Sequence, residues 1–167
     1  MVPRYTVQMP QGPIQRLASL GLRITGALSF LAPLLTRLVI GVGLYYTGHG
    51  KLENLDRTTN FFSSLGIPFP GVNAVFVSCL EYIGGMCIVL GLGTRIFSGL
   101  LCCSMVVAIL TADRQTFGEK FAADLTDVSS FVYLLFLLWL LLYGPGPVSI
   151  DRFLSKWLGV GEKSEET

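Results

Sequence analysis

Residues 72–92 read VNAVFVSCLEYIGGMCIVLGL, an apolar run whose one charged residue is Glu81. A stretch of about 20 apolar residues is long enough to cross the hydrocarbon core of a bilayer as an α-helix. A tight, glycine-containing turn follows at residues 91–94, and a second apolar run extends from Arg95 to Thr111. Residues 72–111 therefore predict two antiparallel membrane-spanning helices joined by a short turn.

Two further apolar runs complete the predicted bundle. One covers residues 33–50, and the other covers residues 128–143 and ends at the sequence GPGP, residues 144–147. Of the 167 residues, 51% are hydrophobic and 14% are charged, and the mean hydropathy is +0.62, whereas a soluble domain carries about 25% charged residues. The expected fold is an all-α integral membrane protein, with an antiparallel four-helix transmembrane bundle over residues 33–147.

The segments that flank the spans are predicted to lie in the membrane interface. Residues 1–32 are expected to form a tail followed by a surface helix, because apolar residues recur at helical spacing from Ile14 onward. A signal peptide is the alternative, but no A-x-A-like cleavage site is present. Residues 51–71 predict a short interfacial helix and a turn, and residues 113–127 a polar loop. Ser149 is the expected N-cap of an amphipathic helix within residues 148–167.

The distribution of basic residues predicts the orientation of the bundle. Four spans place both termini on one side of the membrane. The basic residues of that side are Arg4, Arg16, Arg23, Arg95, Arg152, Lys156 and Lys163, and those of the other side are Lys51, Arg57, Arg114 and Lys120. The positive-inside rule therefore places both termini in the cytoplasm.

Composition argues against several classes of function. The formal net charge is +1 with scattered basic residues, so nucleic-acid binding is not expected. The sequence has a single histidine and no phosphate-binding glycine loop or C-x-x-C pair, so no metal, nucleotide or iron–sulfur site is predicted. The four cysteines are Cys79, Cys87, Cys102 and Cys103. They are interpreted as small apolar filler, with a redox bridge from Cys79 to Cys102 or Cys103 as the alternative.

Arg37 and Glu81 fall inside predicted spans, where a charged side chain costs about 2.5 to 3.5 kcal/mol. Each charge needs a partner, and counting residues down from the outer surface brings the two to similar depths. The predicted arrangement is an intramembrane Arg37–Glu81 ion pair. Two roles stay open for this pair: a structural lock between the first two spans, or a proton or quinone site at Glu81.

Further polar residues gather near the outer ends of the spans. They are Tyr45, Tyr46, His49, Lys51, Asp113 and Asp124. We expect them to form a polar mouth in which His49 could exchange protons near neutral pH. The alternative is that they only mark the points where helices reach water.

Five motifs in fixed order resemble the DoxX family: RLVIG at residues 37–41, GHGKL at 48–52, EYIGG at 81–85, LGLGTR at 90–95 and YGPGPVSID at 143–151. Together with residues 62–68, the resemblance covers residues 33–153. It implies a small four-helix protein of a prokaryotic inner membrane. The charged hallmarks that it carries over are Arg37, Lys51, Glu81, Arg95 and Asp151. The N-terminal stretch of about 30 residues departs from the short start usual in the family and is a candidate docking element.

The resemblance also supplies the functional hypothesis, because the family is named after a subunit of a thiosulfate:quinone oxidoreductase. The chain is expected to be a membrane subunit of a larger electron-transfer complex, not catalytic alone. Its partners would be the lipid bilayer and the other subunits. It would have no cofactor of its own, since no heme, flavin or iron–sulfur signature is present, and quinone is the candidate ligand. The alternatives are a stand-alone carrier of a small molecule or proton, and an assembly factor.

Overall fold

The computed structural model describes residues 12, 26, 28–120 and 125–157, and within these ranges every regular element is a helix. The elements are α2 (Leu31–Glu53), α3 (Leu55–Ser64), α4 (Pro70–Leu90), α5 (Thr94–Thr111), α6 (Arg114–Lys120), the 3-10 turn η1 (Leu125–Asp127), α7 (Ser129–Tyr143) and α8 (Ile150–Trp157). The predicted all-helical fold is confirmed. The surface helix predicted from Ile14 falls outside the described residues, and the division at residues 32 and 147 stays a prediction.

Helices α2, α4 and α5 are long and apolar enough to cross a membrane, while α7 is a shorter apolar helix of 15 residues. At about 1.5 Å per residue, α7 is about 22 Å long. The outer surface of the bundle carries large apolar side chains. Examples, each at least 65% exposed, are Val39, Val72, Ile96 and Leu110. Such a surface is suited to lipid and unsuited to water.

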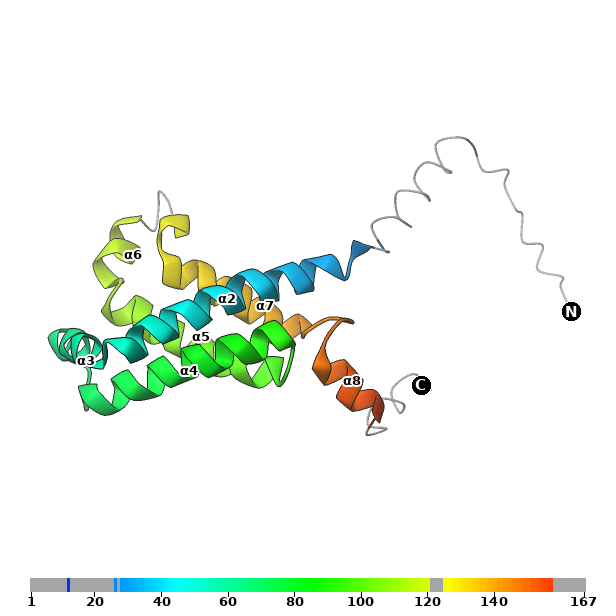
Figure 1. Ribbon diagram of the computed structural model, residues 1–167. Helices are drawn as coiled ribbons and strands as arrows, with labels where there is room; N and C mark the ends of the chain where they lie inside the picture. The colour runs from blue at the N-terminus through cyan, green and yellow to red at the C-terminus, as the bar shows by residue number, and fades with distance from the viewer. Residues whose placement is uncertain (1–11, 13–25, 27, 121–124, 158–167) are drawn as a thin grey trace, which may run out of the picture.

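The four apolar helices lie side by side (Figure 1), with α2 packed on α4 and α5 packed on α7. The core between them is formed by Ile40, Leu44, Ile88, Leu101, Met105, Leu137 and Leu140. Helices α3 and α6 lie at one end of the bundle, and α8 projects from the opposite end. We refer to these as the α3 end and the α8 end.

Glycine sets the close approach of α2 and α4. A Cβ built on Gly85 would lie 2.6 Å from the backbone nitrogen of Tyr45 and 2.7 Å from the carbonyl oxygen of Gly41. Gly48 is equally close to the backbone of Tyr82. Since lipid gives apolar helices no hydrophobic reason to associate, such backbone contact is a main source of packing energy. These contacts fix the antiparallel register, in which Gly48 lies level with Tyr82, Tyr45 with Gly85 and Gly41 with Val89.

The connections agree with the predicted pattern except at one place. The turn between α4 and α5 contains Gly91 and Gly93 in the left-handed region, with φ of 71° and 57°, a conformation that favours glycine. Residues 51–71 contain the predicted short helix, α3, followed by a turn. Residues 113–127 were predicted as a loop, but they contain α6 and η1. The loop prediction is wrong because a short exposed helix can be as polar as a loop.

Candidate functional site

A cavity of about 980 Å³ opens at the α3 end of the bundle. Its wall is formed by α2, α3, α4, α5 and the first turn of α7. The apolar lining includes Phe61, Phe62, Leu65, Phe76, Val77, Leu80, Leu100 and Val107, and the polar lining includes Thr47, Lys51, Arg57, Asn73, Glu81, Ser104, Asp113 and Ser130. A large, mainly apolar cavity with a few converging polar groups has the composition of a small-molecule site.

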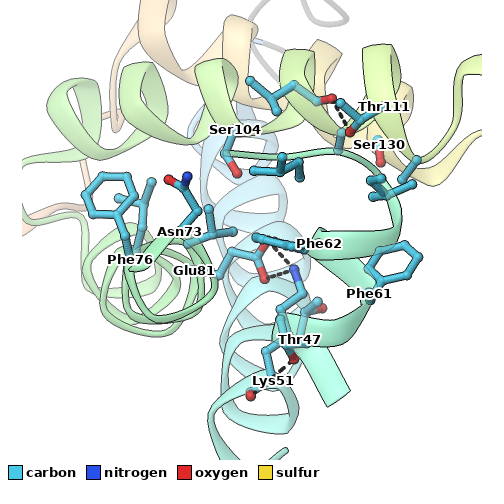
Figure 2. A pocket seen from close by; sticks show the side chains of 18 of the residues that line it. Thr47, Lys51, Phe61, Phe62, Asn73, Phe76, Glu81, Ser104, Thr111 and Ser130 are labelled. Carbon is cyan, nitrogen blue, oxygen red and sulfur yellow. Dashed lines mark hydrogen bonds and ion pairs between the residues drawn. The ribbon is translucent and has the colours of Figure 1, made fainter. Parts of the chain in front are cut away.

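Lys51 and Glu81 form an ion pair on the wall of this cavity. Nζ of Lys51 donates to both carboxylate oxygens of Glu81, at 2.6 Å each. Figure 2 shows the two side chains pointing toward one another, Lys51 from the end of α2 and Glu81 from the middle of α4. The Glu81 side chain is 3% exposed and that of Lys51 is 29% exposed. Both residues line the cavity, but Glu81 is almost wholly buried in its wall, and Lys51 is the more exposed partner.

The length of α2 and its register with α4 together create this pair. The first span was predicted to end at Gly50, but α2 continues to Glu53, so Lys51 is held on a helix. Gly48, one turn earlier, lies against the backbone of Glu81 and Tyr82. This contact brings the Lys51 side chain within reach of the Glu81 carboxylate.

The predicted Arg37–Glu81 ion pair is wrong. Gly91 lies beside Arg37: a Cβ on Gly91 would be 2.5 Å from Nη1 of that arginine. Glu81 precedes Gly91 by ten positions, which is about 15 Å along an α-helix. The prediction counted the depth of each residue from the outer end of its own span. The outer ends of α2 and α4 are not level, because the glycine contacts offset one helix along the other, so equal counts do not give equal depths.

Arg37 instead binds the backbone in and directly after the GPGP segment, at the α8 end. Its guanidinium donates to the carbonyl oxygens of Pro145 and Val148, both at 2.7 Å, and the residue is 2% exposed. A carbonyl has no charge to neutralise the guanidinium, but it supplies hydrogen bonds that a buried cation requires. The buried guanidinium of Arg37 therefore holds the turn at residues 145–148 against α2.

Asp151 completes this anchorage. Its carboxylate accepts hydrogen bonds from the backbone N–H groups of Gly93 and Thr94, at 2.7 and 3.0 Å, at the start of α5. Its own N–H donates to the carbonyl oxygen of Gly91 at 2.9 Å. A carboxylate stabilises a helix N-terminus by satisfying free N–H donors and by its charge. We call the set of Arg37, Pro145, Val148, Gly93 and Asp151 the C-terminal clasp. The predicted Ser149 N-cap is also formed, with the N–H of Arg152 donating to its Oγ at 3.2 Å.

The residues of the predicted polar mouth divide between two places. Tyr46, Lys51 and Asp113 line the cavity. Tyr45 stacks on Tyr82 with ring centroids 4.9 Å apart, and His49 lies 5.9 Å from Tyr82 and pairs with Glu53 at 3.5 Å. Asp124 lies outside the described residues.

Other candidate residues take no part in the cavity pair. Arg95 is exposed at the start of α5. All four cysteines are free thiols, so the alternative of a redox bridge is not realised in this structure. Within the described ranges, no group of three or more His, Cys, Asp or Glu side chains is arranged to hold a metal ion.

The aromatic wall of the cavity is the part of the site that sequence reasoning missed. Phe61 and Phe62 fall within residues 51–71, which were predicted as a short interfacial helix and a turn, but α3 packs beside α4 and these two side chains line the cavity. The amphipathic pattern of residues 55–65 was the available signal. An amphipathic pattern shows that one side of a helix is apolar, but it does not show whether lipid or protein covers that side.

The sequence profile of the DoxX family matches residues 32–114, which include α2 through α5 and the Lys51–Glu81 pair. "Putative oxidoreductase CatD" of Bacillus subtilis is 30% identical over 128 residues, covering 75% of this chain and 89% of that protein. The chain belongs to the DoxX family.

Two other relatives of this DoxX-family protein are known as membrane proteins. "Uncharacterized membrane protein Rv3486" of Mycobacterium tuberculosis is 32% identical over 133 residues, covering 72% of this chain and 79% of that protein. "Inner membrane protein YqjF" of Escherichia coli is 28% identical over 128 residues, covering 74% and 92%. No solved structure matches the DoxX-family chain. The predicted family and membrane location are thus confirmed, and the relatives' names assign no reaction to this chain.

Proposed function

We propose that this protein is a membrane subunit of an oxidoreductase complex and that the cavity at the α3 end binds the head group of a quinone. The observation that carries the proposal is the Lys51–Glu81 pair on the wall of a mainly apolar cavity of about 980 Å³. The name of the Bacillus subtilis relative, which refers to an oxidoreductase, agrees with this class of function.

The chemistry of the cavity fits a quinone. A quinone ring and its isoprenoid tail are apolar and match the surface of Phe61, Phe62 and Phe76. A quinone oxygen accepts hydrogen bonds, and Nζ of Lys51 is a charged donor on the cavity wall. The Glu81 carboxylate beside it can exchange the proton that accompanies reduction of such an oxygen. Electrons would come from a partner subunit.

The complex is tested by purifying the tagged protein from its own membrane in a mild detergent. Proteins that stay bound are identified by mass spectrometry, and the product's absorption spectrum is recorded. Partners in fixed ratio together with flavin, heme or iron–sulfur bands are the expected result. A single colourless species contradicts the subunit role and favours the carrier alternative, which is tested by uptake into proteoliposomes with and without Glu81→Gln.

Quinone binding is tested separately on the purified protein, by equilibrium dialysis against a short-chain ubiquinone or menaquinone analogue. Ser104→Trp places a large side chain in the cavity without changing the ion pair. Val75→Trp adds the same bulk to an exposed position of α4 that does not line the cavity. Loss of binding in Ser104→Trp alone is expected. Equal binding by both variants contradicts the quinone site.

The proposed orientation places the α8 end in the cytoplasm, in a prokaryotic inner membrane. Arg95, Arg152 and Lys156 lie at that end, and the positive-inside rule favours the cytoplasm for it. Labelling of single cysteines introduced at Lys156 and at Arg57 with a membrane-impermeant maleimide, in a background without the native cysteines, tests this orientation. Labelling of the Arg57 position alone in intact cells is the expected result.

A further inference from the structure

A second hollow, of about 880 Å³, lies at the α8 end, on the opposite side of the molecule from the candidate quinone cavity. It is bounded by the first turn of α5, the GPGP segment and the first turns of α8. The residues that matter for its chemistry are Arg95, Ile96, Tyr143, Asp151, Arg152 and Ser155. We call it the arginine hollow.

The two arginines of the hollow are exposed, and neither forms an ion pair within the described part of the chain. The Asp151 carboxylate beside them is already engaged by the N–H groups of Gly93 and Thr94. The guanidinium of Arg95 lies over Gly144, because a Cβ on that glycine would be 3.4 Å from its Nε and Nη2. The hollow is therefore a concave surface with a net positive charge and two sets of unused N–H donors.

The surroundings of the hollow are apolar. Ile96, which lines the hollow, is 71% exposed, and Leu142 and Trp157, at the ends of α7 and α8, are 72% and 78% exposed. Tyr143 stacks on Trp139, with centroids 5.3 Å apart, at the end of α7. Aromatic residues at the ends of apolar helices mark the level of the lipid head groups. A guanidinium pair at that level, beside apolar surface, matches a ligand with a phosphate and acyl chains.

We propose that the arginine hollow binds the phosphate of an anionic phospholipid, with Arg95 and Arg152 as its donors and Tyr143 and Ile96 beside its acyl chains. Guanidinium groups bind phosphate oxygens in a bidentate, charge-assisted manner. Basic pockets between membrane helices bind anionic head groups for the same reason. Bound lipid would cover the junction between α5, α7 and α8, next to the C-terminal clasp.

The test uses the full-length protein in phosphatidylcholine vesicles that contain small amounts of brominated phosphatidylglycerol or brominated phosphatidylcholine. The protein has two tryptophans, and Trp157→Phe leaves Trp139, which stacks on Tyr143, as the reporter. We expect Trp139 to be quenched at a much lower mole fraction of brominated phosphatidylglycerol than of brominated phosphatidylcholine. Equal quenching by the two lipids overturns the proposal.

Three variants in the Trp157→Phe background locate the site. Arg95→Gln and Arg152→Gln should each raise the half-quenching mole fraction of phosphatidylglycerol by about tenfold or more, since each removes charge-assisted hydrogen bonds. Lys156→Gln removes the same charge one turn from Arg152, outside the hollow, and should cost about fivefold or less, the value of a diffuse surface charge. Equal effects in all three overturn the proposal, because they would mean diffuse attraction only.

Free phosphate is the other source of the same chemistry. We expect millimolar inorganic phosphate, at constant ionic strength, to leave the quenching by brominated phosphatidylglycerol unchanged, since the acyl chains contribute to lipid binding. Displacement of the lipid by phosphate at that concentration would overturn the lipid assignment.

Discussion

Lys51 and Glu81 form the one close ion pair between two apolar helices in the described part of the bundle, with Nζ 2.6 Å from each carboxylate oxygen. The partners differ in environment, because the Glu81 side chain is 3% exposed and the Lys51 side chain 29% exposed. Loss of the lysine leaves a buried carboxylate without a counterion. Loss of the acid leaves an ammonium group that can turn toward the cavity.

This asymmetry predicts unequal effects of single substitutions. Lys51→Met should lower the free energy of unfolding by about 3 kcal/mol, the cost of removing one partner of a buried pair. Glu81→Gln should cost clearly less, and the double variant Lys51→Met/Glu81→Gln should recover most of the loss. Thermal unfolding in a mild detergent measures all three. Equal losses for the two single variants would contradict the asymmetry.

Arg37 is predicted to stabilise the α8 end independently of Glu81. Arg37→Gln should lower the free energy of unfolding by about 2 kcal/mol, because hydrogen bonds from a charged donor to two carbonyl groups are lost. It should also speed amide hydrogen exchange in α8. Arg114→Gln, at an exposed position at the start of α6, is the control and should change neither.

The combination Arg37→Glu with Glu81→Arg separates the observed contacts from the pairing that the sequence suggested. If Arg37 binds carbonyl oxygens, the exchanged pair should be no more stable than the single variants. Recovery of stability in the exchanged protein would show that the two residues interact after all.

Asp151 is predicted to act as a cap on α5. Asp151→Ala removes the acceptor for the N–H groups of Gly93 and Thr94 and should cost about 1 to 2 kcal/mol. Asp151→Asn keeps one acceptor oxygen and should cost less. Hydrogen exchange at the Gly93 and Thr94 amides gives the local readout, and an unchanged exchange rate in Asp151→Ala would argue against the cap.

The contact between α2 and α4 is predicted to depend on glycine. Gly85→Ala should lower the free energy of unfolding by about 1 to 3 kcal/mol, since its Cβ would meet the backbone at Tyr45 and Gly41. Gly50→Ala adds the same methyl group where nothing lies within 4 Å, and it should be neutral or slightly stabilising. Unfolding in detergent compares the two, and similar stabilities would contradict the close packing.

Local signals in the sequence were sufficient for the four apolar helices and for the start of α8. The apolar runs predicted α2, α4, α5 and α7, since a membrane requires continuous apolar stretches whose backbone polar groups are satisfied within the helix. Ser149 predicted the start of α8 because an N-cap acts within one turn. Residues 113–127 were wrongly expected to form a loop, since polarity alone does not distinguish a loop from a short exposed helix.

The sequence by itself determined that the chain is a membrane helix bundle and that Arg37 and Glu81 require partners. Only the tertiary structure decided which partners they have. The choice depends on the register of α2 against α4, and that register is set by backbone contacts at Gly41, Gly48 and Gly85. The choice also depends on the GPGP segment folding back against α2, where the carbonyl oxygens of Pro145 and Val148 accept from Arg37. Backbone carbonyl groups are present at every residue, so the side-chain pattern does not indicate which of them Arg37 binds. Contacts between residues distant in the chain follow from packing geometry, which composition and periodicity do not encode.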